Sequence, residues 1–430
     1  MGLLRTCERT RVLCRRRAVA AITLPLIVIA TVAACGSSGK SASTGSPSDS
    51  TSGTASGTPI RIGAVGQQSG LGGDTAKSTA DALVAWSKSV NAAGGIDGHP
   101  VEVIVKDDQN IAANAVTAVK DLITNDHVIA LVGNHENGLD AAWASYASSK
   151  KVPVIGGTAT GATYNTDPNF FPVSETGVNA FFGYVYATKL FGKSTYSQVV
   201  CAEFAACAQA NTLATYYTKA LGIKNVAGQS IAAAATSYTA QCEKLKSEGV
   251  DLVFTGTVLD VSTRFIQGCA VQGFKPAYTQ SGESWKPSVA EDPTWDGQII
   301  MSDAPLWFGD GKGTSAFLAA MQKYAPTSII NGNSTSGWYA GEVFRAAVSA
   351  GIKADGGSTV TSQTVYDGLY ALGPDFDLGG SIAPVTYTKG KPAAQKLCVW
   401  YAQVTNRQLT APKGTAPVCA PAGVSAPPLG

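Results

Sequence analysis

The stretch VNAAGGIDGHPVEVIVKDDQNIAANAVTAVKDLI, residues 90–123, decides the fold. The glycine pair Gly94–Gly95 near its start is a helix stop signal. The run VEVIVKDD, residues 101–108, is rich in β-branched residues and predicts a strand. The amphipathic segment 111–124 predicts a helix directly after it. A helix end, a strand and a second helix in this order indicate a sheet whose strands are connected by helices.

The same alternation extends in both directions along the chain. We expect strands at residues 60–65, 101–108, 128–133 and 153–157, separated by helices at 74–93, 111–124 and 138–150. Strands that alternate with helices of this length form βαβ units. The first part of the chain is therefore predicted to contain a parallel sheet.

A second set of elements begins after Gly177. We expect strands at residues 197–202, 226–233, 250–256 and 276–281, and helices from 178 to 191 and at 208–221, 237–248 and 259–272. Two α/β lobes in succession are the predicted fold class, each Rossmann-like with a parallel sheet. Open sheets of this kind bind ligands beyond the carboxyl ends of their strands, so we expect a small molecule between the lobes.

Composition excludes several classes of protein. The chain has 430 residues, of which 45% are hydrophobic and 14% are charged. This length predicts two or three domains, and so apolar a composition argues against a disordered chain. The formal net charge is only +2, which argues against a nucleic-acid-binding surface.

The N-terminus carries a targeting signal. Residues 1–34 hold six arginines against Glu8 alone, so the basic charge belongs to targeting, and the rest of the chain has 26 basic and 29 acidic groups. The uncharged run AVAAITLPLIVIATVAA, residues 18–34, precedes Cys35. We interpret residues 1–34 as a lipoprotein signal peptide and Cys35 as the lipidated residue, because VAAC resembles the lipobox of bacterial lipoproteins. A permanent membrane-spanning helix is the alternative, but 17 residues interrupted by Pro25 are marginal for spanning.

A polar segment separates this signal from the rest of the chain. Of the 23 residues from 36 to 58, 18 are Gly, Ser or Thr, so residues 35–58 are expected to be a flexible tether with a reach of about 25–30 Å. We expect an exported protein that is held by its lipid at the outer face of the bacterial cytoplasmic membrane. The Arg15–Arg17 run leaves open whether export uses the Sec or the twin-arginine route.

The cysteine content agrees with export. Apart from Cys7, Cys14 and Cys35, the chain has six cysteines, an even number that suggests three disulfides in an oxidising compartment. Six cysteines allow fifteen connectivities. We favour the pairs that lie within one local substructure, namely Cys201 with Cys207, Cys242 with Cys269 and Cys398 with Cys419. The spacing does not suggest a metal site.

Several motifs together resemble a known family. GAVGQQSGLGG (63–73), the stretch 90–123, VIALVG (128–133), VPVIGG (152–157) and SIAPVTYTKGKPAAQKLCVWYAQV (381–404) are similar to the leucine/isoleucine/valine-type substrate-binding proteins of ABC transporters. The resemblance runs from about residue 60 to about residue 407. It implies a type I periplasmic-binding fold, in which two lobes joined by a three-strand hinge close on a ligand.

This resemblance also implies lobe boundaries. Lobe 1 is expected at residues 59–176 and 301–378, and lobe 2 at 177–300 and 379–430, the last part with closing strands and a C-terminal tail. The chain is expected to cross between the lobes near residues 171–176, 299–303 and 377–382.

The resemblance further implies which residues contact the ligand. In lobe 1 these are loop residues that follow the strands: Gln68, Ser69, Gly70, Asn137, Gly138, Thr158 and Thr160. In lobe 2, Glu283 is expected to meet a substrate ammonium group, and Phe204, within CAEFAAC, to supply an aromatic wall. Trp285, Trp338 and Tyr339 are further candidates for packing against the ligand.

Structural explanations compete with these assignments. Each aromatic residue has core packing as its alternative role. Glu136 belongs to the loop after the third strand, which the resemblance places at the pocket, but Glu136, Asp140 and Glu203 have solvated surface charge as their alternative role. His99 in a Gly-His-Pro turn is expected to face water.

No catalytic motif is present, so we predict no enzyme activity, no cofactor and no metal. The favoured function is a monomeric solute receptor that captures a small polar molecule, such as an amino acid or related compound, and delivers it to an ABC permease. A ligand-sensing module of a signalling system is the alternative. An exported enzyme would need a catalytic dyad formed by residues distant in the sequence.

Overall fold

The computed structural model describes residues 55–203, 205–356 and 359–428. The predicted signal peptide, Cys35 and nearly all of the predicted tether lie outside these residues. In the described part of the chain, no helix has both the length and the hydropathy needed to cross a membrane.

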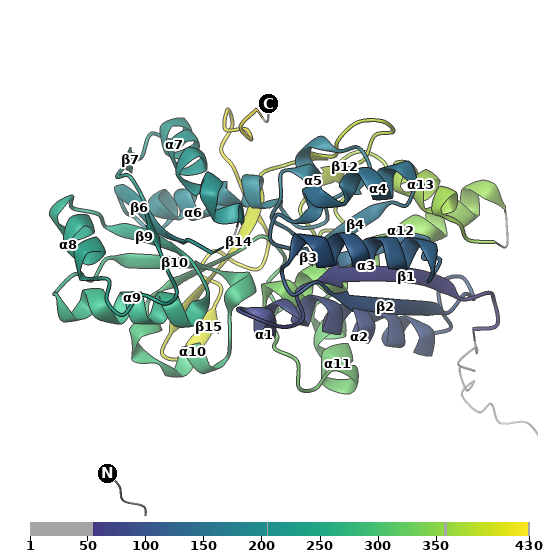
Figure 1. Ribbon diagram of the computed structural model, residues 1–430, viewed down its shortest axis with the longest axis horizontal. Coiled ribbons are helices and arrows are strands. Elements are labelled where there is room, and N and C mark those ends of the chain that lie inside the picture. The colour runs from purple at the N-terminus through teal and green to yellow at the C-terminus, as the bar shows by residue number, and fades with distance from the viewer. Residues whose placement is uncertain (1–54, 204, 357–358, 429–430) are drawn as a thin grey trace, which may run out of the picture. The chain divides into compact units, whose positions relative to one another are not determined.

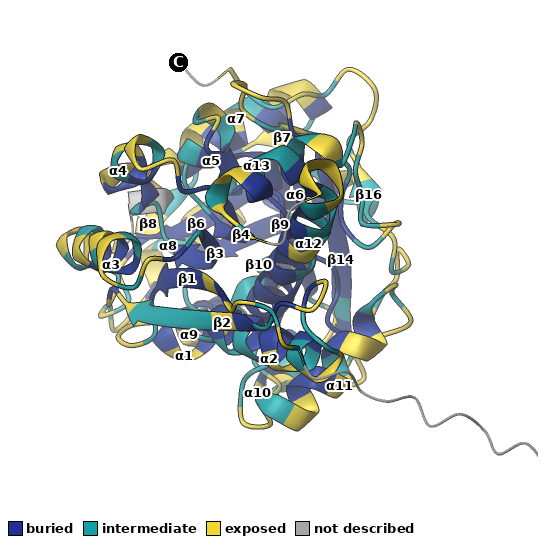
Figure 2. Cartoon of the chain, turned by 90° about the vertical axis from the view of Figure 1, so that its right-hand side faces the viewer, coloured by how far each residue is buried: buried dark blue, intermediate teal, exposed yellow. Residues whose placement is uncertain are grey.

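The first half of the molecule contains a five-stranded parallel sheet. Its strand order is β2-β1-β3-β4-β5. The strands are β1 (Ile60–Gly66), β2 (Val101–Asp107), β3 (Ala130–Glu136), β4 (Val154–Ala159) and β5 (Phe170–Phe171). Ile62 pairs with Val103 on one side and with Ala130 on the other. The central strands are almost wholly buried, whereas the edge strand β2 is half-buried along its length (Figure 2).

Helices cover both faces of this sheet (Figure 1). The elements between its strands are α1 (Gly73–Ala76), α2 (Ser78–Ala92), α3 (Ala112–Thr124), the 3-10 turn η1 (Asp140–Ala142), α4 (Ala144–Ser149) and α5 (Thr163–Thr166). Apolar residues of α3 pack with β1, β3 and β4, and those of α2 pack on the opposite face. Helix α2 ends at a turn in which Gly94 and Gly95 have positive φ, and a Cβ at residue 95 would meet the His99 carbonyl oxygen at 2.3 Å.

The second half contains a larger sheet. Its main strand order is β15-β14-β11-β10-β9-β6-β7, with β8 paired to β6 and β16 paired to β14. The parallel strands are β6 (Thr195–Cys201), β7 (Lys224–Asn225), β8 (Gln229–Ile231), β9 (Leu252–Gly256), β10 (Ala277–Ser281) and β11 (Ile299–Ser302). The C-terminal strands β14 (Cys398–Thr405), β15 (Gln408–Thr410) and β16 (Val418–Cys419) add to it in antiparallel orientation.

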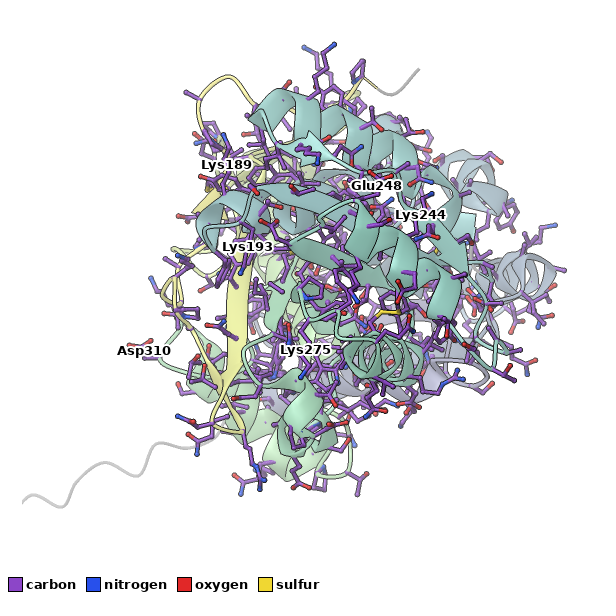
Figure 3. All side chains as sticks on the ribbon, turned by 90° about the vertical axis from the view of Figure 1, so that its left-hand side faces the viewer. Lys189, Lys193, Lys244, Glu248, Lys275 and Asp310 are labelled. Atoms are coloured by element: carbon purple, nitrogen blue, oxygen red, sulfur yellow. A yellow bond between two sulfur atoms is a disulfide. The ribbon has the colours of Figure 1, made fainter. Side chains whose placement is uncertain are left out.

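The helices of the second half match the predicted alternation. They are α6 (Gly177–Leu190), the 3-10 turn η2 (Ala205–Gln209), α7 (Ala210–Leu221), α8 (Thr239–Ser247), α9 (Leu259–Val271), η3 (Gly282–Ser284), α10 (Ser288–Glu291) and η4 (Pro293–Trp295). Figure 3 shows the end of this half, where Lys189, Lys193, Lys244, Glu248 and Lys275 reach the surface. The predicted fold class, two α/β halves with parallel sheets, is confirmed.

Three further helices return to the first sheet. Helices α11 (Thr314–Tyr324), α12 (Gly332–Asp355) and α13 (Ser362–Ala371) follow β11, and α12 packs against α2, β3 and β4. Gly341 allows α12 to lie close to α2, because a Cβ there would be 2.3 Å from the Trp86 ring. The Trp86 indole N–H donates to Glu342 Oε1 at 2.9 Å. These contacts bury one face of the first sheet with residues that come late in the sequence.

A small hairpin precedes the last strands. It consists of β12 (Val385–Thr386) and β13 (Ala394–Gln395). Tyr387 packs edge-on against Phe171, and its hydroxyl donates to the Pro172 carbonyl at 2.7 Å. The hairpin therefore lies against the segment that follows β5, and the chain re-enters the second sheet at β14.

Three disulfides join neighbouring segments. They link Cys201 with Cys207, Cys242 with Cys269 and Cys398 with Cys419, which are the pairs favoured from the sequence. The first closes the loop after β6, the second joins α8 to α9, and the third fixes β16 to β14.

The expectation that His99 faces water is wrong. His99 is buried, and its Nδ1 atom lies 2.9 Å from the carbonyl oxygen of Thr58. The turn after α2 folds back over the start of β1, since Gly57 N also donates to the Gly98 carbonyl oxygen.

Candidate ligand-binding cavity

A cavity of about 370 Å³ lies between the two sheets. Its walls come from the segments that follow β1, β3 and β4 in the first half, and from α6 and the ends of β6, β9 and β10 in the second. All six strands are parallel members of their sheets, so their carboxyl ends converge on this space. This is the position predicted from the alternation of elements.

The wall from the first half is polar, but several of its side-chain donors contact other protein groups. The Thr158 hydroxyl donates to Asn333 Oδ1 at 2.8 Å. The Thr160 hydroxyl donates to the carbonyl oxygen of Glu136. Asn137 Nδ2 donates to Gln67 Oε1 at 3.1 Å and to Asn110 Oδ1 at 3.3 Å. These bonds hold the loops after β3 and β4 in place.

The wall from the second half is largely apolar. Tyr184 on α6 and Phe254 on β9 stack with ring centroids 3.8 Å apart and planes inclined by 18°. Phe181, one turn earlier on α6, meets Phe254 edge-on at 5.7 Å. Val200 and Leu213 extend the same surface. This wall suits the apolar body of a ligand.

Glu283 lies in the cavity next to the buried Asp303. Burial raises the pKa of Glu283, and it raises the pKa of Asp303 well above its ordinary value, to which the neighbouring Glu283 charge adds. The Glu283 carbonyl oxygen accepts from Asn331 Nδ2 at 2.9 Å and Asn333 Nδ2 at 3.0 Å. The backbone of Glu283 is therefore fixed to the start of α12, while its Oε1 atom has no partner among the described residues.

The alternative role of Glu136 and Asp140, solvated surface charge, is wrong. Glu136 ends the central strand β3 and is 1% exposed, and Asp140 begins η1 and is 0% exposed. Burial raises the pKa of both carboxyl groups, and the charges of Asp108 and Asp140 raise that of Glu136 further. Burial also raises the pKa of Asp108 to about 6. Glu203, by contrast, is exposed.

His135 is a cavity residue that the sequence did not reveal. It precedes Glu136 on β3, and burial lowers the pKa of its imidazole to about 4. The ring is therefore neutral at pH 7, with Nδ1 at 3.3 Å from the Thr79 hydroxyl. Its position near the end of a buried strand gave no pattern that distinguishes it from a core histidine.

Five of the predicted ligand contacts do line the cavity: Asn137, Gly138, Thr158, Thr160 and Glu283. The predicted loop residues Gln68, Ser69 and Gly70 are not in the wall. Ser69 instead donates to Asp107 Oδ2 at 2.7 Å, which turns this part of the loop toward β2. Its neighbours Gln67, Leu71 and Gly72 face the cavity in its place.

The candidate aromatic residues pack elsewhere. Trp285 lies against Trp307 at 6.4 Å, Trp338 meets Phe317 edge-on at 5.8 Å, and the Tyr339 hydroxyl donates to the Lys312 carbonyl at 2.8 Å. These are the core contacts that we gave as the alternative. Phe204 lies outside the described residues. The cavity aromatics Phe181 and Tyr184 were missed because α6 is apolar on most of its faces and shows no distinct cavity side.

The arrangement can bind a small molecule that has an apolar body and at least one polar end. In the described part of the chain, no group of three His, Cys, Asp or Glu side chains is placed to hold a metal ion. The polar wall of the first half and the apolar wall of the second half can each contact one part of such a molecule.

Comparisons with known proteins give the family. The family model described as periplasmic binding protein matches residues 59–408. A search of curated protein sequences gave no match. Among solved structures, a branched-chain amino acid ABC transporter protein from Thermus thermophilus with bound valine is similar at TM-score 0.72 and 15% identity, covering 84% of this chain and 97% of that one.

Two other similar structures bind different molecules according to their descriptions. A solute-binding protein of an ABC transporter from R. palustris, in complex with benzoate, has TM-score 0.67 and 17% identity and covers 85% of this chain and 98% of its own. A fatty acid ABC transporter substrate-binding protein from Thermomonospora curvata has the same score and identity and covers 85% and 92%. From the family match, the chain belongs to the periplasmic binding protein family, and its fold is the type I fold that leucine/isoleucine/valine-binding proteins share.

Proposed function

We propose that this protein is the solute-binding lipoprotein of an ABC importer. It captures a small polar molecule, an amino acid or a related compound, between its two halves and delivers it to a permease in the membrane. The cavity built from the carboxyl ends of both sheets is the observation that carries this proposal. The valine, benzoate and fatty acid in the descriptions of similar proteins support a small ligand without choosing among these classes.

Contacts across the cavity rim support a mechanism of closure. Lys286 Nζ, from the second half, lies 2.8 Å from Asp74 Oδ2 of α1 in the first half. A Cβ at residue 72 would lie 3.3 Å from Val258, so the loop after β1 touches the segment before α9. A ligand that contacts both walls stabilises this closed arrangement, and its affinity comes from that difference between open and closed states.

Asn137, Gly138, Thr158, Thr160 and Glu283 are the ligand contacts that we propose from the sequence and that line the cavity. Phe181, Tyr184 and Phe254 join them as the apolar wall. Cys35 is proposed as the lipid attachment site, which places the protein at the outer face of the membrane next to its permease.

The test is a ligand screen on the full chain purified in detergent. Amino acids, amides, amines, aromatic acids and fatty acids are added singly, and the unfolding temperature is measured. A binder is expected to raise it, because a ligand that binds only the folded state stabilises that state. Phe254→Ala should weaken the binder at least tenfold in calorimetry, whereas Val271→Ala, at an 89% exposed position, should leave its affinity unchanged. A screen without any binder would contradict the proposal.

A further inference from the structure

The buried carboxyl group of Asp140 in the cavity wall bears on which ligand the cavity can bind. Asp140 lines the cavity at the start of η1 and is 0% exposed. Neither of its carboxylate oxygens has a hydrogen-bond partner among the described residues. The Thr163 hydroxyl nearby offsets only part of the rise that burial causes in the pKa of Asp140. A buried carboxylate without a partner is costly, so a ligand group that donates to it would gain a strong interaction.

The chain leaves room for this carboxylate. Gly161 follows Thr160 after β4 and passes directly beside Asp140, where a Cβ would lie 2.1 Å from Asp140 Oδ1. Any larger residue at position 161 would displace the carboxylate from the cavity wall. The glycine backbone thus packs directly against the acid, and both residues belong to the cavity wall.

The same wall has little to offer a ligand carboxylate. The side-chain donors of Thr158, Thr160 and Asn137 already contact protein acceptors. The described residues that line the cavity include Asp140 and Glu283 and no lysine or arginine. A ligand carboxylate placed here would face two acidic side chains without a compensating cation.

The opposite wall also favours a cation with an apolar body. The rings of Phe181, Tyr184 and Phe254 form a continuous surface on the second half. Aromatic faces attract an ammonium group and bury hydrocarbon at the same time.

We propose that Asp140 selects the ligand: the preferred molecule is an amine that carries an ammonium group and an apolar body and has no carboxylate at its polar end. This inference rests on the proposed solute-binding function and narrows its substrate class. It predicts that decarboxylated amino acids bind more tightly than the amino acids themselves.

Two matched sets of probes test the inference on the full chain by calorimetry. The first set is 2-phenylethylamine, L-phenylalanine and 3-phenylpropanoate, and the second is 3-methylbutylamine, L-leucine and 4-methylpentanoate. Within each set the apolar body is constant, while the polar end is an amine, an amino acid or an acid. We expect the amine of at least one set to bind at least tenfold more tightly than its amino acid, and the acid to bind weakest.

A pair of variants assigns that preference to one residue. Asp140→Asn should lower the affinity for the amine at least tenfold. Asp108→Asn removes another buried carboxylate of the first half, which does not line the cavity, and should change the affinity less than twofold. Equal effects of the two variants would contradict the role of Asp140. If Asp140→Asn does not fold, the order in which the wild-type chain binds the amine, the amino acid and the acid still tests the amine preference.

The outcomes separate this inference from the proposed function. Tighter binding of an amino acid or an acid overturns the amine preference and leaves the solute-binding function standing. The same holds if none of the six probes binds while the broad screen finds a ligand that is not an amine. If nothing binds in either experiment, the proposed function itself fails.

Discussion

At the scale of single residues, Glu175 connects all three passages between the halves. It lies in the first passage, its backbone N–H donates to the Asp303 carbonyl of the second at 3.0 Å, and its Oε1 accepts from Cys398 N at the start of β14 at 3.1 Å. The side chain is 0% exposed, and this burial raises the pKa of Glu175 to about 8. The carboxyl group is therefore protonated at neutral pH.

From this protonation we predict how the free energy of unfolding changes with pH. A carboxyl group with a raised pKa in the folded state contributes stability below its unfolded pKa, near 4.5, and that contribution is lost as pH rises through about 8. Glu175→Gln keeps an acceptor for Cys398 N and cannot ionise. Between pH 5 and pH 8.5, the free energy of unfolding should fall less for the variant than for the wild-type protein. The difference between the two falls is expected to be on the order of 1–3 kcal/mol.

Urea unfolding at a series of pH values measures this difference. Glu248→Gln, which removes an exposed carboxylate at the end of α8, is the control and should follow the wild-type curve. Parallel curves for wild type and Glu175→Gln would show that Glu175 does not carry its proton into the folded state.

At the scale of elements, two glycines in helices should respond oppositely to the same substitution. Gly341 lies inside α12 against Trp86, whereas Gly268 lies inside α9 and has no atom within 4 Å of the position that a Cβ would take. Gly341→Ala forces the indole or the helix to move and should destabilise the protein by about 1–3 kcal/mol. Gly268→Ala meets no obstacle and should stabilise it by about 0.5–1 kcal/mol.

Chemical denaturation of the two variants provides the comparison. Because each change adds one methyl group to a helix interior, intrinsic helix propensity favours both equally. A stabilising Gly341→Ala would mean that α12 does not approach α2 as closely as the structure shows.

Some helices and strands were predicted from the sequence and one long helix was not. The strand expected at 101–108 is β2 at Val101–Asp107, and the helix expected at 111–124 is α3 at Ala112–Thr124. Helix α12 was not predicted, because its first turns, GNSTSG, are polar and yet buried, so they lack an amphipathic pattern. Its start was signalled only by Asn331, whose side chain forms a capping box with Ser334.

Side-chain directions in the loops limited the prediction of the site. The glycine-rich loop after β1 lies at the cavity through Gln67, Leu71 and Gly72, but a hydrogen bond to Asp107 turns Ser69 away from it. Asp140 was not predicted as a ligand contact, yet it lines the cavity, and it is buried because Gly161 from another loop passes close to it. Contacts between loops distant in the sequence cannot be inferred from local patterns.

At the scale of the whole molecule, the closure that we propose depends on charges at the cavity rim. Lys286 lies between Asp74 of the first half and Asp260 of α9 in the second, at 2.8 and 3.7 Å. Lys286→Glu would place three acids together and favour the open state. We expect it to lower ligand affinity by about three- to tenfold, since an exposed pair is worth up to about 1 kcal/mol and reversal adds repulsion.

Lys244→Glu is the matched control for this charge reversal. Lys244 lies on α8 at the end of the second half (Figure 3) and is exposed, so its reversal should leave the affinity within about twofold of wild type. The affinities for the binder found in the screen are measured at low and high salt. An effect of Lys286→Glu that is equally large in about 0.05 M and about 1 M salt would contradict an electrostatic origin.

Membrane attachment is the remaining prediction at this scale. If Cys35 carries the lipid, Cys35→Ala should move the protein from the membrane fraction to the soluble fraction, because an acyl anchor supplies the hydrophobic affinity for the bilayer. Fractionation of cells that express each form, followed by detection with an antibody, measures the distribution. Cys14→Ala, inside the predicted signal peptide, is the control. Retention of the Cys35→Ala form in the membrane would contradict lipidation at that residue.

The late position of α12 has a consequence for biosynthesis. This helix supplies the partners of Trp86 and covers β3 and β4, although the strands β6 to β11 of the other half lie before it in the sequence. During translation, the part of the apolar face of β3 and β4 that α12 covers stays open until the chain has been made as far as residue 355. Neither half can therefore finish folding before its neighbour has largely been synthesised, and a truncated chain that ends at β11 would expose that face to aggregation.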